Sequence, residues 1–134
     1  MALVLVTHNM GVVADIARRV AVMYAGQVME ERAASSIFAA PQHPYTAALL
    51  SAMPERHVEG GRLATIPGLV PGLSDRPAGC LFAPRCADST PQCAQRPALR
   101  PWQDGLVRCH YPLALPSREA IRAQDVVASA GLSP

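Results

Sequence analysis

Apolar positions are strongly periodic in the first part of the chain. Residues 2–6 form a continuous apolar run, which is typical of a strand buried on both faces of a covered sheet. After Asn9, a candidate helix cap, apolar residues recur at helical spacing over residues 10–20. Arg18 and Arg19 then fall in the last turn, where positive charge suits the helix dipole. The pattern predicts a strand followed by a helix.

A hairpin and two short helices are predicted next. Residues 20–24 read as a strand, residues 25–27 contain a glycine turn, and residues 28–30 resume an extended pattern. One short helix is expected over residues 35–40. Another is expected over residues 44–53, because proline suits the first turn of a helix.

Two polar groups in this region are interpreted as structural. His43 and the Pro44-Tyr45 pair after it resemble a helix start, with a cap, a first-turn proline and a buried aromatic ring. Glu30 and Glu31 are adjacent on a predicted strand, so their side chains point to opposite faces. They are therefore not expected to act as an acid–base pair.

The chain changes character near residue 54. Ten of the thirteen prolines and all four cysteines lie between Pro54 and Pro116. The polar residues 55–57 and the glycines 60–61 mark a boundary over residues 53–62.

Three parts are therefore expected along the chain. Residues 1–53 read as the end of an α/β domain, and residues 54–113 as a small, irregular, cysteine-rich part. Residues 114–134 read as a tail, either one short helix or disordered. A buried strand at residues 2–6 needs sheet neighbours, and the proline-rich remainder offers none. Met1 is accordingly interpreted as an internal methionine of a longer protein.

Charge and composition exclude several classes of function. The formal net charge is only +2, and the basic residues are scattered, so no nucleic-acid partner is expected. All twelve basic residues are arginine, so the chain cannot carry the lysine of a phosphate-binding P-loop. The first apolar run has no basic leader or cleavage site, so it is not a signal peptide. The cysteines are therefore expected in a reducing compartment.

His8 is the first candidate for chemistry. It follows the predicted buried strand, at the kind of position where open α/β sheets bind ligands. A neutral imidazole there can hydrogen-bond a phosphate oxygen or orient a water molecule. From position alone, the simpler interpretation is a histidine satisfied by backbone carbonyls.

The four cysteines give the stronger signal. Their spacing is C-x5-C-x6-C-x15-C, formed by Cys80, Cys86, Cys93 and Cys109. Structural zinc sites usually use closer pairs, so an iron–sulfur cluster held by four thiolates fits this spacing better. His110 is a possible substitute ligand. Two disulfides, or four unlinked thiols, are the alternatives.

These segments together resemble one family, the ATP-binding cassette ATPases, and within it the ATPase subunit of dipeptide and oligopeptide importers. The resemblance covers residues 2 to about 113, and its cysteine-containing part is the more specific. The segments that carry it are residues 3–13 (LVLVTHNMGVV), 20–30 (VAVMYAGQVME), 41–50 (PQHPYTAALL), 66–72 (IPGLVPG), 80–86 (CLFAPRC) and 109–112 (CHYP).

The resemblance implies a fold and a function. Residues 1–53 would end a P-loop NTPase-type nucleotide-binding domain, and the cysteine-rich domain would follow it. ATP binding and hydrolysis would drive peptide uptake through membrane permease subunits, together with a second ATPase subunit. The protein would be cytoplasmic, peripheral on the inner face of the cell membrane.

The resemblance also implies roles for individual residues. His8 would be the switch histidine that contacts the γ-phosphate and holds the attacking water. The four cysteines would hold an iron–sulfur cluster of the 4Fe–4S type, with zinc as the alternative. The P-loop, signature motif and catalytic glutamate are absent from this sequence, and Asn9 stands where the family usually has aspartate. The chain alone is therefore predicted to be inactive as an ATPase.

Two other hypotheses remain open at this stage. The cysteine segment is long enough to form a stand-alone iron–sulfur or zinc-binding module with a sensing or docking role. A protein that pairs with an intact ATPase is a further possibility, although no residue supports it.

Overall fold

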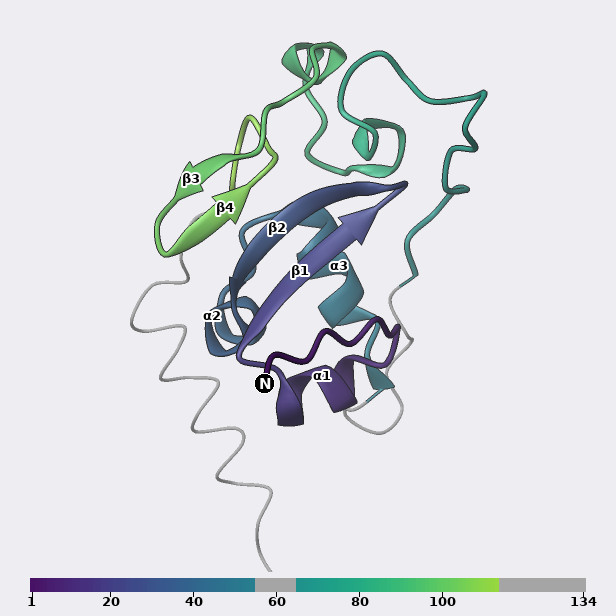
Figure 1. Ribbon diagram of the computed structural model, residues 1–134. Coiled ribbons are helices and arrows are strands. Elements are labelled where there is room, and N and C mark those ends of the chain that lie inside the picture. Colours follow the sequence, from purple (N-terminus) through teal and green to yellow (C-terminus); the bar gives the residue numbers. More distant parts are fainter. Residues whose placement is uncertain (55–64, 114–134) are drawn as a thin grey trace, which may run out of the picture.

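The computed structural model describes residues 1–54 and 65–113 (Figure 1). Short helices and strands alternate in the first part, and a loop-rich segment with two 3₁₀ turns and a small hairpin follows. The elements in chain order are α1 (Met10–Ile16), β1 (Arg19–Tyr24), β2 (Gln27–Ala33), α2 (Ala34–Ala39), α3 (Pro44–Ser51), the 3₁₀ turns Ala83–Arg85 and Pro91–Ala94, β3 (Arg100–Trp102) and β4 (Gly105–Val107).

The four strands form one antiparallel sheet in the order β1-β2-β4-β3. The predicted hairpin is confirmed as β1 and β2, joined by the two residues Ala25 and Gly26. Their φ angles of 47° and 79° are those of a type I′ turn, whose twist matches that of the flanking strands. β4 pairs with β2 through Glu30 and Val107. The sheet therefore joins the first part of the chain to the cysteine-rich part.

The second hairpin, β3–β4, is absent from the sequence prediction, which treated this region as irregular. Its turn is formed by Gln103 and Asp104, and Gln103 has a φ of 51°. The next position, Gly105, requires glycine, because a Cβ atom there would collide with the Arg32 side chain and the Glu31 carbonyl. An Asp-Gly pair between short extended segments is a hairpin signal, but strands of three residues leave little periodicity to detect.

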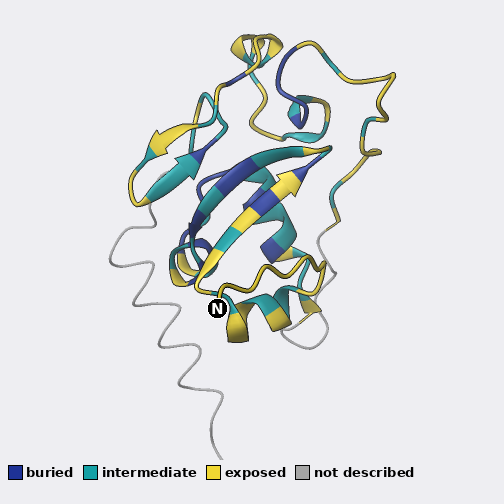
Figure 2. Ribbon diagram, in the orientation of Figure 1, coloured by how far each residue is buried: buried dark blue, intermediate teal, exposed yellow. Residues whose placement is uncertain are grey.

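Two predictions for the beginning of the chain are wrong. Residues 2–6 form no strand and are exposed, because no strand in the described part of the chain pairs with them (Figure 2). α1 ends at Ile16, so Arg19 opens β1 rather than lying in the last helical turn. The predicted cap of this helix is confirmed, since the Asn9 side chain accepts a hydrogen bond from the Val12 N–H at 3.1 Å.

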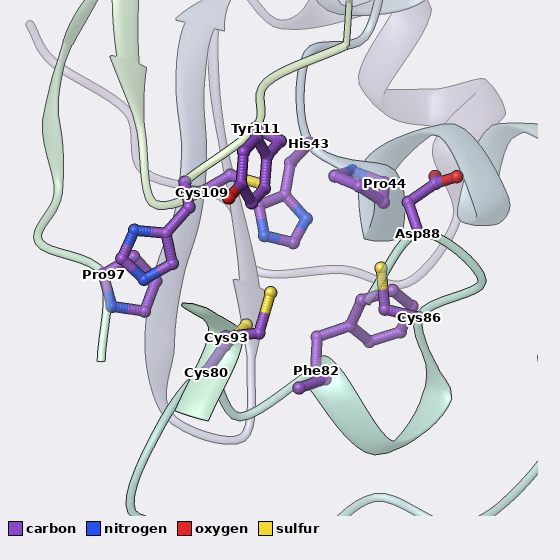
Figure 3. A pocket seen from close by; sticks show the side chains of 12 residues that line it. His43, Pro44, Cys80, Phe82, Cys86, Asp88, Cys93, Pro97, Cys109 and Tyr111 are labelled. Carbon is purple, nitrogen blue, oxygen red and sulfur yellow. The ribbon is translucent and has the colours of Figure 1, made fainter. Parts of the chain in front are cut away.

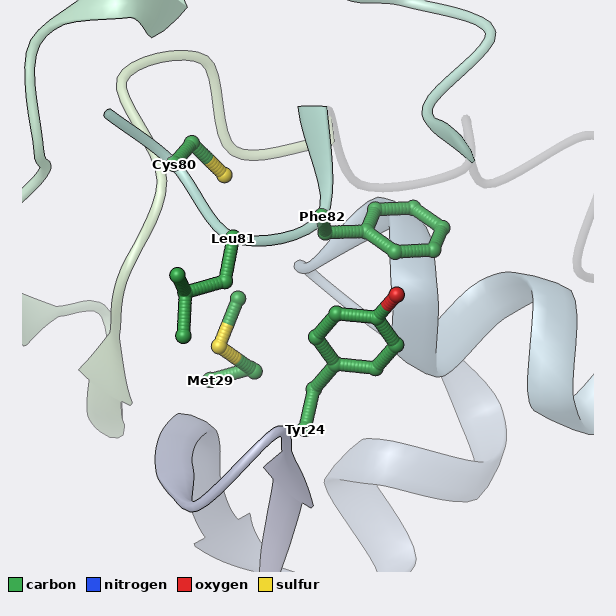
Figure 4. Packing of buried hydrophobic residues seen from close by; sticks show 5 residues of the cluster. All are labelled: Tyr24, Met29, Cys80, Leu81 and Phe82. Carbon is green, nitrogen blue, oxygen red and sulfur yellow. The ribbon is translucent and has the colours of Figure 1, made fainter. Parts of the chain in front are cut away.

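The two other predicted helices are confirmed as α2 and α3, and both pack against the β1–β2 hairpin. Val22, Ile37 and Leu50 form the core between these elements. A second core lies at the turn end of the hairpin and includes residues of the cysteine segment (Figure 4): Tyr24, Met29, Cys80, Leu81 and Phe82. None of the helices in the described ranges is long and apolar enough to span a membrane.

A buried charged network joins β2 to the rest of the fold. The Glu30 carboxylate is fully buried and accepts hydrogen bonds from the backbone N–H groups of Gln42 and His43, each at 2.9 Å. Arg32, on the same face of the strand, donates to the Ala40 carbonyl and to Asp104, each at 2.7 Å. The two charges also contact each other at 3.4 Å. One strand thus fixes both the start of α3 and the β3–β4 turn.

The predicted boundary at residues 53–62 and the predicted tail fall mostly or entirely outside the described residues. The three-part division of the chain therefore stays a prediction. Glu31, unlike Glu30, is only half-buried and pairs with Arg19 at 3.1 Å, as expected for adjacent residues on a strand.

Replacing Glu30 with glutamine is expected to lower the free energy of unfolding by ~3–5 kcal/mol, because the backbone N–H groups of Gln42 and His43 lose a charged acceptor and Arg32 keeps only Asp104 as a charged partner. The new amide NH₂ also faces a backbone N–H. The matched control, Glu31→Gln, breaks the exposed pair with Arg19 and is expected to cost no more than ~1 kcal/mol. Urea denaturation of both variants measures the difference, and equal small losses would contradict it.

Candidate functional site

All four cysteines line one cavity (Figure 3). Cys80 and Cys86 flank the first 3₁₀ turn, Cys93 lies in the second, and Cys109 follows β4. The sequence therefore identified a set of residues that the fold brings together. The cavity has a volume of about 20 Å³, room for roughly one water molecule. The other side chains that line it are His43, Pro44, Phe82, Ala83, Asp88, Pro97, His110 and Tyr111.

Backbone hydrogen bonds hold the cysteine loops against one another. The Cys80 N–H donates to the Cys93 carbonyl at 2.9 Å, which joins the first loop to the second. Gly79 is required beside this contact, because a Cβ atom would collide with the Cys93 carbonyl. The Arg108 N–H donates to the Met29 carbonyl at 2.8 Å, which places Cys109 next to the end of β2. These hydrogen bonds bring the cysteine loops together.

All four cysteines are free, and burial makes three of the thiols weaker acids. Burial raises the pKa of Cys80 and Cys86, and it raises the pKa of Cys109 to about 11. Nearby negative charges raise these pKa values further, because they repel a thiolate: Asp88 acts on Cys86, and a thiolate on a neighbouring cysteine acts on each of the three. Without a cation to stabilise them, these groups are therefore thiols at neutral pH. Metal binding here would have to release protons.

The side-chain positions do not form a ready site for one metal ion. Within residues 1–54 and 65–113, no three His, Cys, Asp or Glu side chains are arranged to hold a metal ion. Tetrahedral zinc with bonds of about 2.3 Å would bring its four sulfur atoms to roughly 3.8 Å from one another. The cysteines converge on one cavity but do not reach this arrangement.

His43 also belongs to this site, although the sequence analysis predicted only a role for it at the start of a helix. That role is confirmed, because the Nδ1 atom accepts a hydrogen bond from the Tyr45 N–H at 3.0 Å. The side chain is 1% exposed, and its Nε2 atom has no hydrogen-bond partner in the described part of the chain. Its ring packs near Phe82 and faces the cysteine cavity. Nothing in the sequence pattern indicated this second role.

Burial lowers the pKa of His43 from 6.5 to about 4. The nearby Arg108 carbonyl favours the protonated ring and so raises this pKa in part. No atom in the described part of the chain, this carbonyl included, lies in hydrogen-bond geometry to Nε2. The ring is therefore neutral at physiological pH.

The metal-free chain is expected to lose stability as the pH falls from about 6.5 towards about 4. In this window the unfolded state binds a proton at His43 and the folded state does not. Between pH 7 and pH 5 the loss is about 2 kcal/mol. Urea denaturation at the two pH values measures it. His43→Asn keeps a capping oxygen and should remove this loss. The carboxylates titrate in both proteins, so their contribution cancels when the two are compared.

The two remaining candidate residues lie in different places. His8 is in the exposed segment before α1 and is not among the residues that line the cysteine cavity. His110 does line it, and its Nε2 atom lies 2.9 Å from the Gln95 carbonyl. His110 is thus in the right region for a substitute ligand, whereas His8 belongs to a separate part of the surface.

Comparison with known proteins points to one family. Residues 29–93 match the family described as the oligopeptide/dipeptide transporter, C-terminal region. This range includes β2 from Met29 onwards, both later helices and three of the four cysteines.

Individual relatives extend the match over 84% of the chain. The dipeptide transport ATP-binding protein DppD of Escherichia coli is 55% identical over 115 residues, and DppD of Haemophilus influenzae is 48% identical over 114 residues. The oligopeptide transport ATP-binding protein OppD of Salmonella typhimurium is 42% identical over 113 residues. The chain spans about a third of the length of these relatives, 34–35%.

Proposed function

Because the chain belongs to the family of dipeptide and oligopeptide transport ATP-binding proteins, whose C-terminal region it carries, we propose that it serves in an ATP-binding subunit of a peptide importer. The observation that supports this most is the 55% identity over 115 residues. In this proposal, residues 1–53 end a P-loop NTPase-type nucleotide-binding domain. Residues 54–113 form its cysteine-rich appendage, and residues 114–134 are a tail.

The exposed apolar run at residues 2–6 supports this assignment. Leu3, Val4 and Val6 are 78%, 88% and 93% exposed, a pattern that suits a strand whose sheet neighbours lie in another part of the domain. His8 directly follows this apolar run, where it would contact the γ-phosphate of ATP and hold the attacking water. The phosphate-binding lysine must come from outside this chain, so the chain by itself is predicted not to hydrolyse ATP.

The proposal includes partners and a location. Such a subunit would couple ATP binding and hydrolysis to transport by docking on membrane permease subunits, beside a second ATPase subunit, on the cytoplasmic face of the membrane. A stand-alone metal module is not favoured, because the similarity to transport ATP-binding proteins covers 84% of the chain and extends beyond the cysteine segment.

A chimera tests the transport role. E. coli DppD with its C-terminal third replaced by this chain is expected to restore dipeptide uptake in cells that lack DppD. His8→Ala in the chimera should lower ATP hydrolysis by about a hundredfold or more, because the attacking water loses its hydrogen-bond partner. Asp15→Asn, an exposed change on α1, is the control and should have no comparable effect. Uptake that survives His8→Ala would contradict the proposed role of this residue.

We also propose that Cys80, Cys86, Cys93 and Cys109 hold an iron–sulfur cluster of the 4Fe–4S type, with zinc as the alternative. Their convergence on one cavity supports this, and so does the preference of soft thiolates for such groups. A cluster carries its own bridging sulfides, so it accepts thiolates that are farther apart than those around one ion. Once bound, it would cross-link the loops and provide a one-electron redox centre.

Anaerobic purification tests this assignment. The chain is expected to be brown and to contain iron and sulfide. Cys86→Ser should lose both, because a thiolate ligand is removed. Asp88→Asn, which alters the same cavity without removing a thiol, should keep them. Colourless protein with zinc would replace the cluster by a four-thiolate zinc site. Protein without either metal would contradict both assignments.

A further inference from the structure

The second nitrogen of the His43 ring requires an explanation beyond helix capping. It is buried, it has no hydrogen-bond partner among the described residues, and it belongs to a side chain that lines the cysteine cavity. A buried polar atom without a partner is costly, and such atoms are rare in folded proteins. Phe82, Pro44 and Pro97 line the same cavity, and their side chains offer this nitrogen no hydrogen-bond acceptor.

Hydrogen bonding to the backbone fixes which nitrogen carries the proton. Nδ1 accepts from the Tyr45 N–H, so it must present a lone pair. In a neutral imidazole the hydrogen then lies on Nε2, which becomes a donor. A donor nitrogen has no lone pair for a metal. His43 is therefore suited to donate to a group in the cavity and not to ligate one.

The position of the ring is also fixed from its backbone. The His43 N–H donates to the buried Glu30 carboxylate at 2.9 Å, and Pro44 limits the following backbone. The side chain is thus held from both ends, by Glu30 at the backbone and by the Tyr45 N–H at Nδ1. A donor held in this way is already oriented before any acceptor binds.

We propose that His43 is a positioning residue of the four-cysteine site, whose Nε2–H donates a hydrogen bond to a sulfur atom of the metal centre. The inference rests on the proposed function of the cysteines. Sulfur atoms of thiolates and clusters carry negative charge and accept such bonds. Hydrogen bonds to these sulfurs raise the reduction potential of a cluster, and partners of this kind also strengthen metal binding.

The competing explanation is that His43 only caps α3, with the nearby Arg108 carbonyl as a poor acceptor for Nε2. Two substitutions separate these roles. His43→Asn retains a capping oxygen close to Nδ1 and lacks a donor at the reach of Nε2. His43→Gln retains an amide N–H at that reach and lacks the Nδ1 acceptor.

The experiment uses the whole chain loaded with iron and sulfide, and it follows a reductive titration by visible absorption. We expect His43→Asn to lower the equilibrium constant for one-electron reduction about tenfold, a shift of ~59 mV to more negative potential. His43→Gln should stay within a few-fold of the wild type. The melting temperatures of the metal-free proteins should show the reverse order, with His43→Gln the less stable variant.

If the chain instead takes up zinc, competition with a chelator replaces the titration. His43→Asn should then bind zinc about 10–100-fold more weakly, and His43→Gln should bind it nearly as well as the wild type. A nitrogen-15 NMR spectrum of the metal-free chain that places the ring hydrogen on Nδ1 would overturn the inference.

The outcomes separate this inference from the function it rests on. Normal metal uptake with equal potentials or affinities in all three proteins leaves the four-cysteine site intact and overturns the role of His43. If the potential or affinity changes in the same order as the melting temperature, His43→Gln is the more affected variant. That result also overturns the inference and leaves capping as the role of His43. No uptake of iron, sulfide or zinc by the wild type overturns both.

Discussion

The buried carboxylate of Glu30 is the contact on which both the fold and the cysteine cavity depend. It holds the backbone of Gln42 and His43, and Arg32 beside it holds Ala40 and the turn at Asp104. Such a network is favourable only when every charge has its partners, because the protein interior screens weakly. The same pair of strand residues therefore sets the start of α3, the position of β4 and the orientation of His43.

Local signals in the sequence were sufficient for the elements whose contacts are local. The β1–β2 hairpin has a glycine turn, and α3 has a first-turn proline, so both could be predicted. The β3–β4 hairpin was missed because Pro101 weakens the strand signal, and only pairing beyond β4, to β2, stabilises the element. The apolar run at residues 2–6 has a strand pattern but forms no strand, because no strand in the described part of the chain pairs with it.

In the candidate site, too, some residues could be predicted from the sequence and one could not. Four cysteines within one irregular segment are conspicuous in a sequence, and their spacing already indicated a common ligand. His43 gave no such indication, because it belongs to a different element and reaches the cavity only through the buried contact with β2. Its position before Pro44 predicts the role of only one ring nitrogen, Nδ1, which caps the helix. The other nitrogen acquires a role only from residues that are distant along the chain.

The hydrogen bond between Arg108 and Met29 has a consequence for the order of folding. It joins residues that are far apart in sequence, and Cys109 reaches the cavity only when β4 has paired with β2. Contacts of long sequence separation form late, because a large loop must close first. During synthesis, the first three cysteines therefore leave the ribosome before the fourth can join them. Until that last strand docks, they are thiols exposed to oxidants and to competing metals.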